Sequence, residues 1–300
     1  MILAEELQRR IDVAIVEEHN KEERRGYLGA SQLGKPCDRA VWLTFHWATI
    51  EKLDARKIRL FDRGHKEEDR VYKWLEPIAE QILTLNPKTG KQWKATAHNG
   101  ILSGSCDGAV KIDGLWYLLE VKTHGQKSFD ELKKLKSVKV TKPQYWTQVH
   151  LYMGMMKLPA AIHINDCKND DDMYIEVIPF DADYFTYEHA RALDIILDDT
   201  GEASIKISEA SNWWQCNMCN HKKVCKGGEM PDRNCRTCRH CVPAQEETWI
   251  CSGFDKPIAL SKNEQITSAV VCDGYQPHAI FIPENNEVMK FNLDSKLNLK

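Results

Sequence analysis

Hydrophobic residues recur at helical spacing near the start of the chain. Leu3, Leu7, Ile11 and Ile15 repeat every four residues and predict an amphipathic helix over residues 2–19. The same periodicity analysis, applied along the chain, predicts a mixed α/β domain that ends near residue 205. Its further elements are a helix at 36–43 with Pro36 in its first turn, one or two helices over 58–83 interrupted near Pro77, a helix at 143–157, strands at 160–164 and 173–178, and a helix at 183–197.

Residues 103–122 alternate between apolar and polar positions and predict a β-hairpin. Its turn is Asp113-Gly114, a dipeptide that favours the two-residue turns of hairpins. A two-residue loop at these positions pairs residues whose numbers sum to 227. The register therefore places Asp107 opposite Glu120 and Ser105 opposite Lys122, with Glu120 and Lys122 on one face of their strand.

Asp107 and Glu120, directly opposite each other, would repel unless one is protonated or a cation lies between them. Mg2+ or Mn2+ resolves the repulsion, and Lys122 on the same face is suited to orient or activate an attacking water. This combination favours phosphodiester hydrolysis. The alternative is a solvated face with an ordinary Glu-Lys contact, but Glu120 follows the apolar run 116–119, which is typical of a buried strand.

The composition is typical of a globular chain, and the sequence also indicates the cellular compartment. The 300 residues include 42% hydrophobic and 28% charged positions, and the net charge is −3, so nucleic-acid binding would depend on local basic patches. Apolar runs are too short to span a membrane, and the charged N-terminal residues do not resemble a signal peptide. We therefore expect a cytoplasmic protein with no membrane partner.

A lysine-rich stretch precedes the predicted helix at 143–157. Such a run is usually a solvated surface, but beside a phosphodiesterase site it becomes a candidate contact surface for DNA phosphates, independent of base sequence. The lysines are Lys133, Lys134, Lys136, Lys139 and Lys142.

Eleven cysteines are the unusual feature of the composition, because clustered thiols in an intracellular chain are more often metal ligands than disulfides. Eight of them lie within residues 216–272. The first three, Cys216, Cys219 and Cys225, are spaced to surround one metal centre that still needs a fourth ligand. If that metal is zinc, the fourth ligand is His221 or Cys235.

A second cysteine pair, Cys235 and Cys238, can be completed to a four-cysteine zinc site by Cys251 and Cys272. Cys241 and His240 are alternative ligands, but they follow Cys238 so closely that we expect them to be spare or supporting groups. These residues predict a small zinc-ribbon-like domain over 231–300 that depends on its metal for stability. Its role is either structural or the docking of DNA or a partner protein.

Three segments, taken in order, resemble the PD-(D/E)XK nuclease superfamily and its RecB-like exonuclease branch. They are Gly104-Ser105-Cys106-Asp107-Gly108, Leu119-Glu120-Val121-Lys122-Thr123 and Gln148-Val149-His150-Leu151-Tyr152, with Arg63-Gly64-His65 upstream. The resemblance implies a restriction-endonuclease-like core, in which a mixed central sheet is flanked by helices. It also implies that His65, Asp107, Glu120 and the carbonyl of Val121 bind Mg2+ or Mn2+, that Lys122 is the catalytic lysine, and that Gln148 and Tyr152 touch DNA or support the site.

In the same branch, a distant N-terminal cysteine joins a C-terminal Cys-x2-Cys-x5-Cys segment to hold a 4Fe-4S cluster. The resemblance therefore implies the ligand set Cys37, Cys216, Cys219 and Cys225, which would stabilise the fold by closing a long loop. The expected division is then a nuclease core at 1–205, an iron-sulfur segment at 206–230 and the zinc-bound domain at 231–300.

These expectations describe a metal-dependent DNA exonuclease that acts in DNA end processing or recombination, of the kind encoded by phages or mobile elements. Its partners would be DNA with a free end and a recombination or replication protein. Two alternatives stay open: a non-catalytic DNA- or protein-binding module that kept the fold, and a zinc-dependent regulator whose activity lies in residues 231–300. Glu68, one helical turn beyond His65, either supports the metal ligands or faces solvent, and we slightly favour solvent.

Overall fold

The structure is a computed structural model that describes residues 2–210 and 212–282. The described residues divide into two compact units, neither of which is a single stretch of chain. The first unit takes residues within 1–25, 52–96 and 103–188, and the second takes those within 26–51, 97–102 and 189–282. The domain boundaries expected at residues 205 and 230 therefore stay predictions. Both cysteine groups fall inside the second unit.

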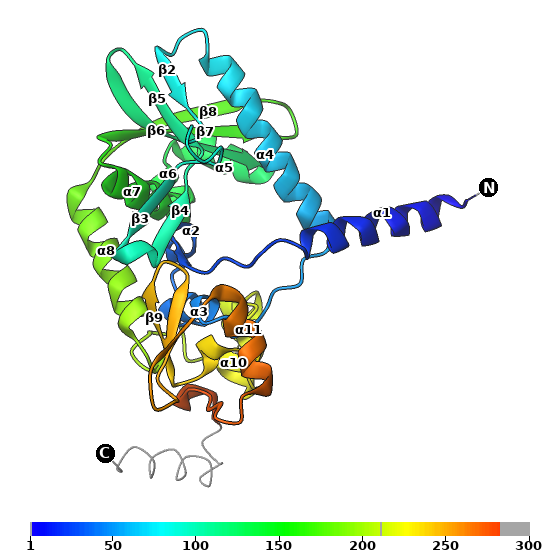
Figure 1. Ribbon diagram of the computed structural model, residues 1–300. Coiled ribbons are helices and arrows are strands. Elements are labelled where there is room, and N and C mark those ends of the chain that lie inside the picture. The colour runs from blue at the N-terminus through cyan, green and yellow to red at the C-terminus, as the bar shows by residue number, and fades with distance from the viewer. Residues whose placement is uncertain (1, 211, 283–300) are drawn as a thin grey trace. The chain divides into compact units, whose positions relative to one another are not determined.

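A five-stranded mixed sheet forms the centre of the first unit (Figure 1). Its strands, in spatial order, are β2 (Gln81–Leu83), β5 (Gly108–Ile112), β6 (Leu115–His124), β7 (Ala160–Cys167) and β8 (Met173–Pro179). The central pair β6 and β7 is parallel, whereas the other neighbours in this sheet are antiparallel. This topology confirms the mixed α/β class and the restriction-endonuclease-like central sheet.

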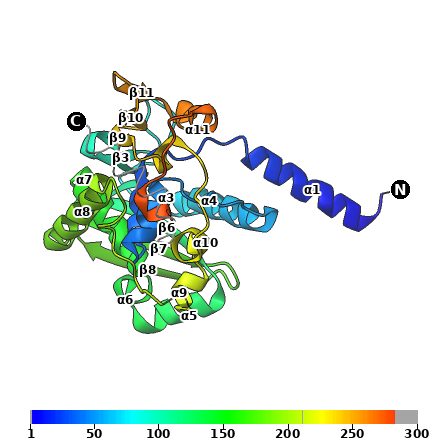
Figure 2. The ribbon, with the colours of Figure 1, turned by 90° about the horizontal axis from the view of Figure 1, so that it is seen from below.

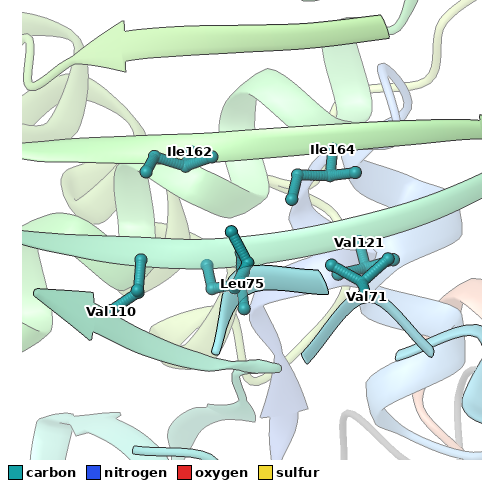
Figure 3. Close-up of a cluster of buried hydrophobic side chains, with 7 residues drawn as sticks. Val71, Leu75, Val110, Val121, Ile162 and Ile164 are labelled. Atoms are coloured by element: carbon teal, nitrogen blue, oxygen red, sulfur yellow. The ribbon is translucent and has the colours of Figure 1, made fainter. Parts of the chain in front are cut away.

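Helix α4 (Ala55–Leu75) covers one face of this sheet. Its side chains Val71 and Leu75 pack against the strands in one buried cluster (Figure 3). The strand residues of this cluster are Val110, Leu119, Val121, Ile162 and Ile164. α4 ends two residues before Pro77, and the expected helical continuation to residue 83 is wrong, because residues 81–83 form β2 and pair with β5.

The opposite face of the sheet is covered by α5 (Gln126–Leu135), α6 (Val138–Thr141) and α7 (Pro143–Met156), which confirms the predicted helix near 143–157. Helix α1 (Ala4–His19) has no buried side chain and extends away from the rest of its unit in both views (Figures 1 and 2). Strands β3 (Lys94–Ala97) and β4 (Leu102–Ser105) are neighbours in a smaller sheet.

The predicted hairpin register is confirmed where the two strands pair. Both turn residues, Asp113 and Gly114, have positive φ, as a two-residue hairpin turn of this kind requires. The pairs run from Gly108 with Leu119 to Ile112 with Leu115. A local turn signal therefore fixes the alignment of the whole hairpin.

The expected pairing of Ser105 with Lys122 is wrong, because Ser105 belongs to β4 and a different sheet. The chain leaves the hairpin at Gly108, where φ is 154° and a β-carbon would lie 2.8 Å from the carbonyl oxygen of Leu83. Asp107 therefore lies just beyond the last strand pair, at the point where the chain changes sheet.

The second unit combines the segment 26–51 with the C-terminal part of the chain. Its sheet has three antiparallel strands, which lie beside α11 (Figure 2). Its elements are β1 (Leu28–Gly29), α2 (Ala30–Leu33), α3 (Asp38–Phe45), η1 (His98–Gly100), the later part of α8 (Ala182–Leu197), α9 (Trp214–Asn217), α10 (Lys222–Gly227), η2 (Cys235–Thr237), β9 (Cys241–Gln245), β10 (Thr248–Cys251), β11 (Ile258–Leu260), α11 (Lys262–Val271) and η3 (Ala279–Phe281).

Arg236 is fully buried in the second unit and joins segments that are far apart in sequence. Burial lowers the pKa of its guanidinium to about 9, while Glu247 acts in the opposite direction, so the group stays positively charged at neutral pH. The guanidinium donates hydrogen bonds to the carbonyl oxygens of Gly26, at 2.7 Å, and Phe45, at 3.1 Å, and to Oε1 of Gln265, at 2.6 Å. It also lies over the rings of Trp47 and Trp249, whose centroids are 3.7 and 4.7 Å away.

Across the described residues, none of the helices combines the length and the apolar character that crossing a membrane requires.

Leu119→Ala should lower the free energy of unfolding by about 2–5 kcal/mol, because it opens a cavity in a fully buried cluster. The matched control is Leu115→Ala on the same strand, where the side chain is 55% exposed and little should change. Chemical denaturation followed by circular dichroism measures both variants. Equal losses in the two would contradict the assignment of this core.

Candidate functional site

Strand β6 carries the first two residues of the candidate site because its side chains alternate between faces. Leu119 and Val121 enter the cluster under α4, so Glu120 and Lys122 face α7 on the other side of the sheet. The strand is parallel to β7 at this point, and both of its faces are covered. Two ionisable groups are thereby held in an environment that usually contains only apolar residues.

Glu120 has no exposed surface. Its Oε1 accepts hydrogen bonds from Nε2 of Gln148, at 2.9 Å, and from Nζ of Lys122. Its Oε2 is buried and has no hydrogen-bond partner among the described residues. Burial raises the pKa of Glu120 to about 7, with Lys122 opposing and Asp107 adding to the rise.

Asp107 is held by one hydrogen bond to its carboxylate and one to its backbone carbonyl. Its Oδ2 accepts a hydrogen bond of 2.8 Å from the amide of Val121, and its carbonyl oxygen accepts one of 2.6 Å from the hydroxyl of Tyr72. The carboxyl group therefore lies next to Glu120 across the end of the hairpin, as the predicted register requires. With only 9% of its surface exposed, Asp107 adds a second carboxylate to the buried site.

Lys122 is the cation that faces these carboxylates. Its Nζ pairs with Glu120 and donates a bond of 3.2 Å to the carbonyl oxygen of Val121. Burial alone would lower the pKa of this amine, but Glu120 and Asp107 outweigh burial and raise the pKa above its usual value. Lys122 is therefore a stable ammonium ion in this arrangement.

Helix α7 supplies Gln148 and Tyr152, one helical turn apart on the face that meets the sheet. The two residues are buried, and burial followed by the charge of Glu120 raises the pKa of the Tyr152 phenol. A β-carbon on Gly104 would lie 2.4 Å from the Tyr152 hydroxyl oxygen, so only glycine fits at that position. The predicted motif residues of three separate segments thus meet at one site.

Glu68, which the sequence led us to expect in solvent, belongs to this site instead. It lies on α4, half-buried, and its Oε2 accepts a bond of 3.1 Å from Nε2 of Gln92. Burial raises its pKa to about 8, followed by repulsion from Asp107, with Lys122 opposing and Glu120 adding to the rise. The sequence signal for this position is the four-residue spacing of Glu68 and Tyr72, which places both on one face of the helix. In the structure that face is the one that interacts with Asp107.

No described contact joins His65, expected as a metal ligand, to these residues. It is exposed on α4, one turn nearer the helix start than Glu68, and none of the hydrogen bonds or ion pairs found among the described residues involves it. Val71 and Leu75 anchor the later turns of α4 on the sheet. Glu68 lies closer to that anchor and interacts electrostatically with the carboxylates.

His163 is a further buried group that the sequence analysis did not single out. It lies directly beside Glu120 in the pairing of β6 with β7, has no exposed surface, and neither of its ring nitrogens has a hydrogen-bond partner in the described part of the chain. Burial lowers its pKa to about 3, and Lys122 adds to this effect. The imidazole is therefore neutral and adds no second cation to the site.

The chemistry of the donor set fits a hard divalent cation. Three acidic side chains interact electrostatically, Lys122 pairs with one of them, Glu120, and Oε2 of Glu120 is an acceptor without a donor among the described residues. Within residues 2–210 and 212–282, no three His, Cys, Asp or Glu side chains are placed around a single ion position. Mg2+ does not require that, since it binds through one or two carboxylates and retains several waters.

The lysine-rich stretch is divided between two helices and their connections. Lys133 forms an ion pair with Asp172, and Nζ of Lys139 lies 5.2 Å from the ring centroid of Trp146. Lys142 precedes α7 and acts electrostatically on His124 at the end of β6, whose pKa is lowered mainly by burial. Lys134 and Lys136 are exposed, on α5 and at its end. Of the five lysines, Lys142 is thus the one linked to the strand that carries Glu120 and Lys122.

Four cysteines line one small pocket in the second unit. They are Cys37, Cys216, Cys219 and Cys225, together with His221 and Lys206. Cys37 lies at the start of α3, and the other three lie in or beside α9 and α10. Burial raises the pKa of the Cys219 and Cys225 thiols, and Cys37 acts electrostatically on both. The expected set of four is therefore gathered in one place.

The downstream cysteines are arranged differently from the expected set. Tight backbone turns join Cys235, Cys238 and Cys241: the amide of Cys238 donates to the carbonyl of Cys235 at 3.1 Å, and the amide of Cys241 donates to the carbonyl of Cys238 at 3.0 Å. Cys241 is also the strand partner of Cys251. The contacts described for Cys272 are made by its carbonyl oxygen, which accepts from Arg233 and from the amide of Tyr275, and its thiol is half-exposed. The structure thus groups Cys241, not Cys272, with the first pair, because Cys241 begins the strand that pairs with β10.

Comparisons with known proteins give only distant likenesses. No protein-family profile matches the chain, and no curated protein matches it. The crystal structure of SSO0001 aligns with 74% of this chain and 96% of that one, at 15% identity and a TM-score of 0.45. LHK-Exo, an alkaline exonuclease from Laribacter hongkongensis, aligns with 62% of this chain and 90% of that one, at 14% identity and 0.38.

The complex of LHK-Exo with dAMP aligns with 57% of this chain and 86% of that one, at 15% identity and a TM-score of 0.42. At these TM-scores the likenesses carry no argument about function. The functional proposal rests on the residues of the site.

In the absence of divalent cations, the protein should lose stability as the pH rises from about 4.5 to about 8. Glu68 and Glu120 have pKa values of about 8 and about 7 in the folded protein, above their ordinary value of 4.5, so the folded state holds more protons than the unfolded state in this range. Thermal unfolding in a chelator across this range measures the slope. Glu68→Gln should flatten it, and Glu76→Gln, an exposed position at the end of α4, should not; the same slope in wild type and Glu68→Gln would contradict the assignment.

Proposed function

We propose that this chain is a divalent-cation-dependent deoxyribonuclease that hydrolyses phosphodiester bonds. The observation that carries the proposal is the pair of buried carboxylates Asp107 and Glu120 beside the ammonium group of Lys122, with the half-buried Glu68 acting on them electrostatically. In this set Oε2 of Glu120 lacks a hydrogen-bond donor among the described residues. A protein that only needed stability would gain little from this set, because each buried carboxylate costs free energy unless it is paired. Metal-dependent catalysis explains why the carboxylates are kept.

Asp107, Glu120 and Glu68 are the residues that would hold Mg2+ or Mn2+, with the carbonyl of Val121 as a further ligand. When bound, the cation supplies Lewis acidity: it lowers the pKa of water and offsets negative charge on the phosphodiester. Tyr72 and the amide of Val121 hold Asp107 in place from opposite ends. Gln148 fixes the orientation of Glu120, so that Oε2 stays free for the ligand role.

Lys122 contributes a positive charge in this proposal, not a base. Its raised pKa keeps the amine protonated at neutral pH, so it donates hydrogen bonds and does not remove a proton from water. An ammonium ion at this place stabilises the negative charge that develops on the phosphate oxygens during attack. Of the two roles expected for this lysine, the structure favours orienting and stabilising.

DNA is the proposed substrate, and the sequence resemblance to the RecB-like branch favours action at DNA ends. Lys142 is the lysine of the basic stretch that acts electrostatically on His124 at the strand end beyond Lys122, and we propose that it contacts the backbone of the bound strand. Lys134, Lys136 and Lys139 extend the basic surface along α5 and α6. Lys133 contributes less, because Asp172 neutralises it.

Lys122→Ala and Glu68→Gln should each reduce the rate of DNA cleavage by about 100-fold or more, because each removes a charge that acts on the transition state or on the cation. His65→Ala, on the same helix, should change the rate less than about threefold, because its side chain is exposed and no described contact joins it to the cluster. The assay uses end-labelled linear DNA and a covalently closed circle, with Mg2+ or Mn2+. Binding of DNA in a chelator should be unchanged in all three variants.

The comparison of Glu68 with His65 decides the ligand set. A strong loss in His65→Ala with full activity in Glu68→Gln would restore the set expected from the sequence. Full activity of Lys122→Ala would refute the nuclease proposal. Folded wild-type protein that binds DNA and cleaves none of these substrates would favour the non-catalytic binding module.

We also propose that Cys37, Cys216, Cys219 and Cys225 hold a 4Fe-4S cluster, in line with the sequence resemblance. The support is that all four line one pocket, although they come from both ends of the chain. A cluster distributes its thiolates over four iron atoms, so sulfurs that do not share one ion position still fit it. The zinc alternative would use Nδ1 of His221, which is buried without a hydrogen-bond partner among the described residues, while Nε2 lies 2.8 Å from the hydroxyl of Thr44.

Cys216→Ser should lower the iron and acid-labile sulfide content of anaerobically purified protein at least about threefold and remove its visible absorbance. The control is Cys272→Ser, at a half-exposed cysteine of the same unit that does not line the pocket. Iron content unaffected by Cys216→Ser would refute the cluster.

A further inference from the structure

Four buried cysteines of the second unit have no part in the proposed nuclease or in the iron-sulfur pocket. Cys235 and Cys238 lie at the two ends of the short turn η2, Cys241 begins β9, and Cys251 ends β10. They are 7%, 6%, 2% and 8% exposed, respectively, and all are free thiols. Four such residues gathered within a short stretch of chain call for an explanation beyond ordinary core packing.

Backbone contacts hold the four cysteines close together. The amide of Cys238 donates a hydrogen bond of 3.1 Å to the carbonyl oxygen of Cys235, and the amide of Cys241 donates one of 3.0 Å to the carbonyl oxygen of Cys238. Cys251 is the direct cross-strand partner of Cys241, which brings their β-carbons to within about 4.5–5.5 Å. Strand pairing thereby adds a fourth thiol to the three that lie on these tight turns.

The backbone gathers the four cysteines, although no three ligating side chains of the described residues surround one ion position as the side chains now stand. A tetrahedral zinc site has Zn–S bonds of about 2.3 Å, so two of its ligand sulfurs lie about 3.8 Å apart. Binding therefore requires that the thiols lose their protons and turn toward a common centre. We propose that Cys235, Cys238, Cys241 and Cys251 bind one Zn2+ ion.

This ligand set replaces Cys272 of the sequence-based expectation by Cys241. Thiolates are soft ligands, so four of them select zinc and disfavour the hard cations of the carboxylate site. On binding, the four thiols release their protons to solvent, and the ion is neither oxidised nor reduced. The closed, four-sulfur coordination marks the site as structural, with no position left for a reacting water.

The position of Arg236 shows what the ion would stabilise. Arg236 lies between the ligands Cys235 and Cys238, and its guanidinium is held by Trp47, Trp249 and backbone carbonyls of the segment 26–51. Zinc bound at the two neighbouring cysteines would fix the backbone from which this side chain projects. The site would therefore set the conformation of the whole second unit, including the residues around Cys37.

The test measures zinc and iron in the purified full-length protein and in two matched variants by elemental analysis. Wild type and Cys272→Ser should retain about one zinc per chain, and Cys241→Ser should retain at least about threefold less while its iron content is unchanged. Measuring iron in parallel separates this site from the iron-sulfur pocket. Zinc retained in Cys241→Ser, or lost in Cys272→Ser, would overturn the proposed ligand set.

A second measurement applies if Cys241→Ser does not fold. Wild-type protein stripped of zinc is titrated with Co2+ and followed by absorption spectroscopy, because Co2+ reports its own coordination. Intense tetrahedral bands with thiolate charge transfer, removed by addition of Zn2+, are the expected result. Weak octahedral bands only, or a disulfide among the four cysteines in protein purified under reducing conditions, would overturn the proposal.

Discussion

The burial of Glu120 is the constraint on which the first unit depends. A carboxylate without solvent contact must find donors or a cation within the fold, and the central sheet brings them from different parts of the chain. Lys122 comes from the same strand, Gln148 from α7, and Asp107 from the point where the chain changes sheet. The same acidic surroundings keep Lys122 protonated. The contacts that offset the buried charge of Glu120 are therefore the same contacts that assemble the candidate site.

Short-range sequence signals predicted the parts of the fold that short-range physics determines. The turn at Asp113-Gly114 needs no tertiary partner to favour a two-residue hairpin, and the register that follows from it is correct. The departure of Ser105 into another sheet was not predictable in this way, because it depends on the carbonyl of Leu83 packing against Gly108. Glu68 was misassigned for the same reason: its burial comes from the docking of α4 on the sheet, which the helix sequence alone does not report.

The cysteines show the same limit of short-range sequence signals. Spacing along the chain identified two groups, and the structure gathers the first group from positions as far apart as Cys37 and Cys225. Spacing could not decide between Cys241 and Cys272, because the choice depends on which strand pairs with β10. Strand pairing of this kind is a long-range property that a cysteine motif does not encode.

The discontinuous second unit has a consequence for the synthesis of the protein. Chains emerge from the ribosome N-terminal end first, so the segment 26–51 appears long before its partners. Trp42 must wait for the carbonyl of Asp198, and the carbonyl of Phe45 must wait for Arg236, while residues 52–188 can already form most of the first unit. The segment 26–51 therefore stays without these partners until Asp198 and Arg236 have emerged.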